Sequence, residues 1–508
     1  MLIRSSRKLL PHVLLAALTV LTILIQGYHP YAEDGGIYVV GIKYLLNPTI
    51  YPYSAEFVLE PTRFSLFAPA MAGLVRGLHI SLPVLLLTVY IGSTWLLLYA
   101  GWQIASRCIA NLGGRIGAVS LLAVWCGLPV AGTSLMIMDP YVTARSLTTP
   151  LALLAVAMAL DLRSPNRHKR AFFWCLACLC IAACLHPLMA AYSFGFILLL
   201  CCEQSDYARL RRWAPLCLGI SAITLAALLQ ITAPPDNAAY SAVVLTRYYW
   251  FPDDWHWYEI FGLTAPLLIV AGIDRLSAKS FRFCPVASAL SRATVSIGLI
   301  TMAVAFLFAR AATSTHIVAR LQPLRCFQMV YLVMLLLLGG VAGKLWKRGK
   351  APWAGAAFAV LAGGMFFVQQ QPYSSSDHLD MPWRAPRNSW VQAFLWVRQN
   401  TPTDALFALD ADYITIAGED AQCFRAIAER STLPDFSKDG GEASIMPGLT
   451  AAWTIGSKVQ AGLSSQTDAE RSKRLLPLGV SWMVLKAAAN TNFDCPYRND
   501  TVKVCHMR

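Results

Sequence analysis

Residues 9–38 read LLPHVLLAALTVLTILIQGYHPYAEDGGIY, and this stretch sets the organisation of the whole chain. Its first part, 9–27, is an apolar run of the length that an α-helix needs to cross a bilayer. Basic residues precede the run, and bulky residues follow it where a signal peptidase would need small ones. We therefore interpret it as a retained anchor, with a cleaved signal peptide as the alternative. Two acids, Glu33 and Asp34, follow directly and are expected at the outer membrane surface.

Composition places the chain among polytopic membrane proteins. It has 508 residues, of which 56% are hydrophobic and only 14% are charged, whereas about a quarter of a soluble protein is charged. The pattern predicts an α-helical polytopic membrane protein with about 11 transmembrane helices and a small C-terminal α/β extracytoplasmic domain. The expected spans lie near 9–27, 82–105, 116–132, 147–161, 171–186, 188–203, 214–232, 258–273, 286–309, 327–343 and 353–371.

The net charge of +14 has a topological explanation. The basic residues gather in short loops on one predicted side, as in 163–170 and 209–212, and this side is the cytoplasmic one by the positive-inside rule. No basic domain is left over, so we expect no nucleic-acid partner. The N-terminus is then cytoplasmic. Short loops suit a bacterial inner membrane, with the C-terminal domain in the periplasm.

Two regions are expected to form the domains. Residues 1–371 form the multi-span transmembrane domain, whose long first outer loop, 28–81, contains an amphipathic helix near 37–47. The segment 62–80 is apolar but interrupted, and we interpret it as an interfacial helix, because a further span would break the alternation of basic loops. From 372 to 508 the composition turns polar, and helix and strand patterns alternate, as expected of an extracytoplasmic α/β domain.

The cysteines of this tail also suggest a location. Cys495 and Cys505 bracket a short hydrophilic stretch and would close a disulfide if the tail lies outside the cytoplasm. Cys423 would then be left unpaired.

Glu33 and Asp34 are the first candidate site. A carboxylate here would serve as a general base for an acceptor hydroxyl, or as a metal ligand. Two glycines follow and would let the backbone approach a ligand closely. The alternative is that Asp34 caps the helix that begins near Ile37. We favour Asp34 as the catalytic residue, with Glu33 beside it, because adjacent side chains point in different directions.

A second candidate lies in the last outer loop, 310–326. Its basic residues have no acid among them, and arginine binds phosphate oxygens bidentately. The alternative is that these side chains reach to lipid headgroups. The substrate-binding candidates in this loop are Arg310, His316, Arg320 and Arg325.

Two further residues are weaker candidates for substrate binding. Asp139 with Arg145 is either a second acidic site or an ion pair of the loop. His186 precedes Pro187 at the end of a span, where it either lines the site or has a structural role in the turn. The sequence shows no phosphate loop, no His-Glu-x-x-His and no zinc spacing.

The layout resembles that of the C-type membrane glycosyltransferases, the GT-C fold. Ala32-Glu33-Asp34-Gly35-Gly36 stands where that family has its first-loop acidic motif. The segments 400–407 and 478–484 are similar to pieces of tail domains in such proteins. The resemblance matches no specific subfamily, and the tail lacks the Trp-Trp-Asp-Tyr-Gly signature of oligosaccharyltransferases.

This resemblance implies an inverting sugar transfer from a polyprenyl-phosphate-linked donor to an acceptor at the extracytoplasmic face. Asp34 would act as the base, and the arginines of 310–325 would hold the lipid phosphate. The resemblance specifies no cofactor, and a divalent metal is left as an alternative. Two rival hypotheses stay open: a transporter or flippase of an amphipathic substrate, and a non-catalytic membrane protein with a binding tail. The near absence of charge inside the spans disfavours ion-coupled transport.

Overall fold

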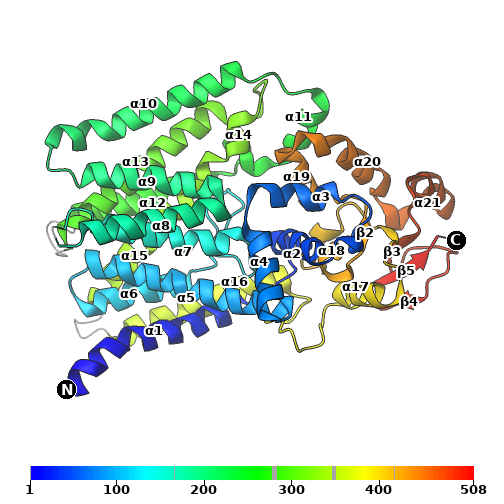
Figure 1. The fold of residues 1–508 in the computed structure, drawn as a ribbon, viewed down its shortest axis with the longest axis horizontal. Coiled ribbons are helices and arrows are strands. Elements are labelled where there is room, and N and C mark those ends of the chain that lie inside the picture. The colour runs from blue at the N-terminus through cyan, green and yellow to red at the C-terminus, as the bar shows by residue number, and fades with distance from the viewer. Residues whose placement is uncertain (1, 165, 277–282, 346–350, 417, 508) are drawn as a thin grey trace.

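The computed structural model describes residues 2–164, 166–276, 283–345, 351–416 and 418–507. Long helices lie side by side along the longest axis of the molecule, and the tail caps one end of this bundle (Figure 1). The N-terminus lies at the opposite end. The bundle helices are α1 (Leu2–Gln26), α5 (Leu82–Cys108), α6 (Leu112–Val124), α7 (Ala144–Ala159), α8 (His168–Leu185), α9 (Pro187–Glu203), α10 (Ala208–Thr232), α12 (Trp257–Leu276), α13 (Pro285–Phe308), α15 (Phe327–Leu345) and α16 (Ala351–Gln370).

A helix therefore forms at each of the eleven predicted positions. In the described residues, five helical segments are long and apolar enough to cross a membrane, and crossing by all eleven stays a prediction. The five segments are Leu82–Cys108, His168–Leu185, Ala208–Thr232, Pro285–Phe308 and Ile317–Gly343. Two inner loops expected to be basic, 277–282 and 346–350, lie outside the described residues.

Glycines let two central helices approach each other closely. Gly113 and Gly117 on α6 face Gly339 and Gly343 on α15, so each helix presents a pair of glycines four residues apart. A Cβ at Gly117 would come within 2.5 Å of the Gly339 carbonyl oxygen. Without a hydrophobic driving force between helices in lipid, such close packing is a main source of their association.

The predicted span at 116–132 is shifted and interrupted. Its helix, α6, ends at Val124, and residues 125–143 form an irregular, largely buried segment instead. Irregular backbone at this depth is tolerated only where its polar groups are satisfied. Val130 N donates to Leu135 O at 2.8 Å, and Gln328 Nε2 donates to Ile137 O at 2.9 Å. This segment carries Asp139 to the end of the bundle that meets the first outer loop, where Arg145 contacts both Asp139 and Asp34.

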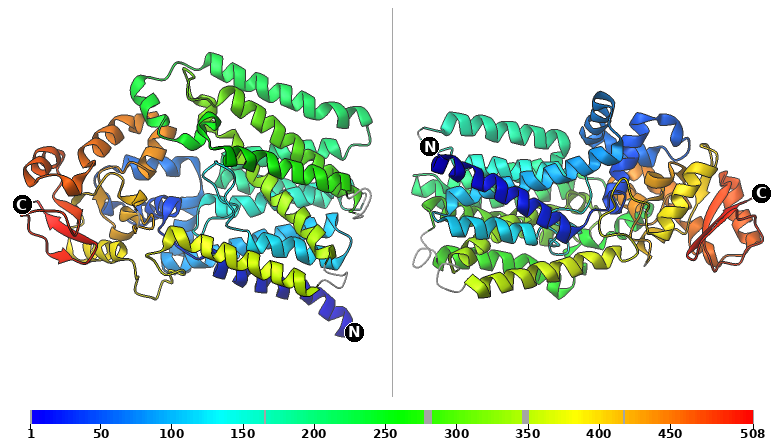
Figure 2. Two further views of the ribbon diagram at one scale, coloured as in Figure 1. Left: turned by 180° about the vertical axis from the view of Figure 1, so that it is seen from behind. Right: turned by 90° about the horizontal axis from the view of Figure 1, so that it is seen from below.

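The first outer loop, 28–81, forms three α-helices, α2 (Glu33–Leu46), α3 (Glu56–Leu59) and α4 (Phe67–Leu78), with short 3-10 helices at Pro48–Ile50 and Glu60–Phe64. The helix predicted near 37–47 begins earlier, at Glu33, so both acids lie in its first turn. The segment predicted to lie at the interface forms α4. It runs across the direction of the bundle rather than along it, as the right-hand view of Figure 2 shows.

The tail contains a sheet with the strand order β2-β1-β3-β5-β4. β1 pairs in parallel with β2 and β3, and β5 pairs antiparallel with β3 and β4. Neighbouring strand residues serve opposite faces: Phe407 packs toward α17 and α18, and Ala408 packs toward the other apolar layer, with Leu463 and Leu475. The strands are β1 (Leu406–Ala408), β2 (Ser431–Thr432), β3 (Trp482–Lys486), β4 (Tyr497–Arg498) and β5 (Val502–His506). The helices are α17 (Ser389–Asn400), α18 (Phe424–Ala428), α19 (Lys438–Ile445), α20 (Thr450–Gln460) and α21 (Asp468–Leu475).

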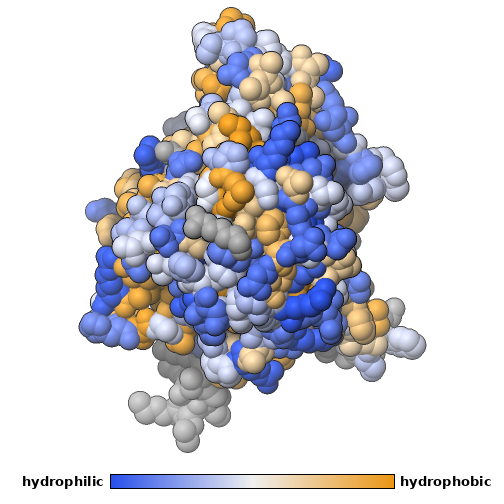
Figure 3. All heavy atoms as spheres, turned by 90° about the vertical axis from the view of Figure 1, so that its right-hand side faces the viewer, coloured by the Kyte–Doolittle hydropathy of each residue, from blue (hydrophilic) through white to orange (hydrophobic). Residues whose placement is uncertain are grey.

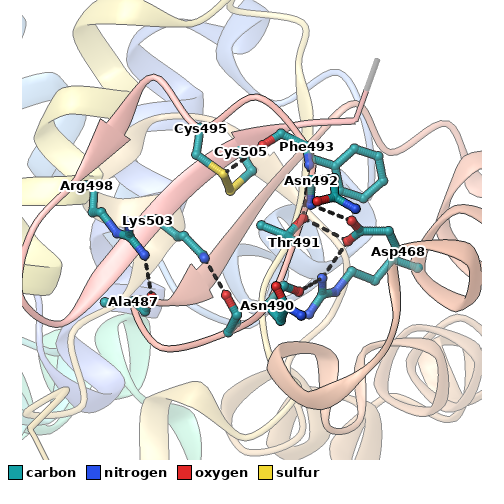
Figure 4. The surroundings of a disulfide bond; sticks show 12 residues. Asp468, Ala487, Asn490, Thr491, Asn492, Phe493, Cys495, Arg498, Lys503 and Cys505 are labelled. Carbon is teal, nitrogen blue, oxygen red and sulfur yellow. Dashed lines mark hydrogen bonds and ion pairs between the residues drawn. A yellow bond between two sulfur atoms is a disulfide. The ribbon is translucent and has the colours of Figure 1, made fainter.

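The predicted disulfide joins Cys495 to Cys505 (Figure 4). Cys423 is a free, buried thiol. The bond ties the segment before β4 to β5. The preceding loop is held by Asp468, which accepts hydrogen bonds from the Thr491 hydroxyl and the Asn492 N–H, both at 2.7 Å. The outer face of the tail is mainly hydrophilic with scattered apolar residues, as expected of a surface in contact with water (Figure 3).

Candidate functional site

Glu33 and Asp34 lie where the bundle, the first outer loop and the tail meet. Glu33 has a positive φ of 51°, and its N–H donates to Ala421 O in the tail at 2.9 Å. The following glycines are packed against protein: a Cβ on Gly35 would come within 2.8 Å of Tyr141, and one on Gly36 would collide with Cys423. The expectation that they bring backbone close to a ligand is therefore replaced by a packing role. The N-cap residue of α2 is Ala32, and Asp34 lies inside the first turn rather than at the capping position.

Arg145 joins two of the predicted acids. It lies in the first turn of α7, which begins earlier than predicted, and the Thr143 N–H there donates to the Ser146 hydroxyl at 3.0 Å. Its Nη2 atom lies 3.0 Å from Asp34 Oδ2 and 3.0 Å from Asp139 Oδ2. Asp139 and Arg145 are buried, whereas the Asp34 side chain is 33% exposed. The structure thus brings Asp34 of the first outer loop into contact with the Asp139–Arg145 pair.

Lys438 approaches the same acids from the tail. It is the first residue of α19, and its Nζ atom contacts Glu33 Oε2 and lies 3.4 Å from Asp34 Oδ1. Asp34 is therefore held between two cations, one from the bundle and one from the tail. Since 404 residues separate Asp34 from Lys438 in sequence, no local pattern connects them.

The charges around Asp34 keep it ionised. Burial would raise its pKa, but Lys438 and Arg145, helped by Arg325, outweigh burial and hold the pKa of Asp34 well below its usual range. Asp139 differs: burial raises its pKa in spite of Arg145. Burial, with the negative charges of Asp439 and Asp34, raises the pKa of Glu442 on α19 to about 8. The site thus combines an ionised carboxylate with a neighbouring acid that is protonated at neutral pH.

Arg325 also belongs to this region. It interacts electrostatically with Asp34 and Arg145, and its Nε atom is buried without a hydrogen-bond partner in the described structure. It lines two small pockets, one against Thr149 of α7 and Tyr192 of α9, the other against Tyr249. His186, at the junction of α8 and α9, is half-buried and lies within the positive field of Arg145 and Arg325.

The other candidates of the last outer loop have partners of their own. Arg310 Nε pairs with Asp253 Oδ2 at 2.9 Å on the surface. The buried His316 places Nδ1 2.8 Å from Asp236 Oδ2 and Nε2 3.3 Å from Ala311 O. Arg320 interacts electrostatically with the Tyr240 hydroxyl. These contacts hold loops together, and the described structure brings only Arg325 of this group to Asp34.

A metal ion has no evident ligand set here. The described residues contain no group of three or more His, Cys, Asp or Glu side chains arranged to hold one. Glu33, Asp34 and Asp139 instead face Lys438 and Arg145. Cationic neighbours repel a divalent ion, so the site does not fit a metal in this arrangement, and we derive no step through one.

No family model and no curated protein matches the sequence. Among solved structures, the chain is similar to the crystal structure of the Archaeoglobus fulgidus oligosaccharyltransferase in complex with zinc and sulfate. The match has a TM-score of 0.48 and 12% identity, and it covers 93% of this chain and 68% of that chain. At this level the similarity assigns neither a family nor an activity.

Proposed function

We propose that the protein is a membrane glycosyltransferase that moves a sugar from a polyprenyl-phosphate-linked donor to an acceptor at the extracytoplasmic face. The observation that carries this proposal is an ionised, part-exposed carboxylate, Asp34, between Arg145 and Lys438, with the buried Arg325 guanidinium nearby. A base for a hydroxyl and cations for an anionic group are thus supplied together.

The proposed reaction uses these groups in one displacement. Asp34 accepts the proton of the acceptor hydroxyl as the hydroxyl oxygen bonds to the anomeric carbon. The bond from that carbon to the phosphate oxygen breaks, and its electron pair leaves with the lipid phosphate. Arg325 and Arg145 stabilise the negative charge that develops there, as preorganised cations do in a site shielded from water. The two pockets beside Arg325 offer small, partly apolar space next to this charge.

The position of the charges disfavours the transport hypothesis. Helix α2 lies at the end of the bundle that meets the tail, not midway along it (Figure 1). Asp34 is in the first turn of this helix and contacts Arg145. An ion-coupled transporter places ionisable groups near the middle of its spans.

Turnover of the donor tests the proposal. The purified protein would be incubated with a set of polyprenyl-phosphate sugars and candidate acceptors, and release of polyprenyl phosphate would be measured. Loss of a general base typically costs about 10²–10⁴-fold in rate, so Asp34→Asn should lose activity by that factor and keep its fold. Asp253→Asn, which alters a surface acid, is the matched control. Absence of release from every donor by the unaltered protein would contradict the proposal.

A further inference from the structure

The tail is anchored on both sides of the site. On one side, α18 packs on the first outer loop: Lys43 Nζ bonds to Glu429 Oε1 at 2.7 Å, and the Tyr51 hydroxyl donates to Arg425 O at 2.9 Å. On the other side, α19 meets α11 (Ala238–Val244), where the Tyr240 hydroxyl donates to Ser444 O at 2.7 Å. The segment between these anchors lies over Glu33 and Asp34.

The backbone that presents Lys438 is fixed from several directions. The buried Arg247 donates from Nη1 to Ser437 O at 2.6 Å and from Nη2 to Phe436 O at 3.0 Å. The Lys438 N–H donates to Asp435 Oδ1 at 2.6 Å. The next residue, Asp439, forms a buried ion pair with Arg425 at 2.7 Å. These contacts fix the backbone at Lys438, so its flexible side chain starts from a defined point beside Glu33 and Asp34.

We propose that Lys438 is a positioning residue through which the tail controls Asp34, keeping the carboxylate unprotonated until the donor phosphate competes for the cations. This inference rests on the proposed function and extends it to regulation by the donor. A carboxylate between two cations is a poor base. When a phosphate anion draws Lys438 and Arg145 toward itself, Asp34 loses their stabilisation and becomes a stronger base. Base strength would thus rise only when the donor is in place.

Other charged and titratable groups also face Asp34. The cations are Arg145 of α7, Arg325 of the last outer loop and Lys438 of α19. The acids are Glu33 of α2, Asp139 of the segment before α7 and Glu442 of α19. The phenols are Tyr38 of α2, Tyr141 of the segment before α7 and Tyr373 after α16. Lys438 is the cation that the tail contributes to this set, and Glu33 competes with Asp34 for it.

Infrared titration of the Asp34 carboxyl group tests the inference without requiring turnover. The full-length protein in nanodiscs would be titrated, and the Asp34 band would be assigned by its loss in Asp34→Asn. An opposite charge within about 4–6 Å lowers a carboxyl pKa by about 1–3 units. Lys438→Met should therefore raise the pKa of Asp34 by about one unit or more, and Lys438→Arg should restore a low pKa. Lys458→Met, at an exposed lysine of α20, should leave it unchanged.

Two further measurements distinguish a positioning role of Lys438 from a purely structural one. Glu33→Gln removes the competing acid, so it should lower the pKa of Asp34, opposite to Lys438→Met. Added polyprenyl monophosphate should raise the pKa of Asp34 in the unaltered protein by more than in Lys438→Met. Equal Asp34 titration in the unaltered protein and Lys438→Met, or no response to the phosphate lipid, would overturn the inference. Since this readout needs no donor turnover, its failure is distinct from failure of the proposed transferase activity.

Discussion

Two groups of basic side chains, one around Asp34 and one in the last outer loop, have different partners. Around Asp34 the contacts are shared: Arg145 serves two acids, and Lys438 serves two. In the last outer loop the contacts are one-to-one, Arg310 with Asp253 and His316 with Asp236. In a one-to-one ion pair, each charge is already neutralised by its single partner. A cation that two carboxylates share can bind a further anion by giving up one of them. The cluster around Asp34 is therefore suited to binding an anion, whereas the pairs of the last outer loop are suited to holding the loops together.

The largest effect should follow removal of Arg145. Arg145→Met leaves Asp139 buried without its cation, and breaking a buried ion pair from one side costs about 3–5 kcal/mol. We expect strongly reduced thermal stability in detergent and little accumulated protein. Adding Asp139→Asn to Arg145→Met should recover part of the stability. If Arg145→Met alone were as stable as the unaltered protein, the buried cluster would not be the linked unit described here.

A smaller effect, on function rather than folding, is expected at Arg325. Hydrogen bonds to charged groups contribute about 1.5–3 kcal/mol, so Arg325→Gln should weaken donor use by about 10- to 150-fold in kcat/KM. Thermal unfolding should change little, because the Nε atom has no partner to lose in the described structure. A fall in stability with unchanged kcat/KM would instead make Arg325 a support residue like His316.

The smallest effect is expected at Arg310. Exposed ion pairs contribute about 0–1 kcal/mol, and the Arg310 side chain is 54% exposed. Arg310→Gln should therefore leave both thermal stability and kcat/KM within about twofold of the unaltered protein. A loss comparable to that of Arg325→Gln would show that the last outer loop acts as one phosphate site, as the sequence suggested.

The sequence predicted the parts of the fold that depend on local pattern. Apolar runs located the helices of the bundle, and the alternation of helix and strand patterns after 372 predicted the mixed secondary structure of the tail. Helix ends depend on tertiary contacts that a local pattern does not show. Helix α6 ends at Val124, and the irregular residues beyond it accept hydrogen bonds from neighbouring helices, as Gly127 O does from Gln369 and Ile137 O from Gln328. The glycine pairs of α6 and α15 have a four-residue spacing that is typical of closely packed membrane helices. Composition alone does not show this spacing.

The candidate site likewise contains residues that a local sequence pattern indicates and residues that it does not. Glu33 and Asp34 stood out because acids beside an apolar run are unusual. Lys438 had no such signal, because a lysine in a polar tail is ordinary until its neighbours in space are known. Arg310, His316 and Arg325 looked equivalent in sequence, and only their partners distinguish them.

The contact between Glu33 and Lys438 spans 405 residues, which has a consequence for synthesis. Chains grow at about 5–20 residues per second, so roughly 20–80 s separate the emergence of the two residues. Arg145 follows Asp34 by only 111 residues and reaches it much earlier. During translation the acids would first meet the bundle alone, and the complete charge arrangement would form last. A truncated or stalled chain would thus be inserted in the membrane without a finished site, so assembly itself would delay activity until the whole chain is made.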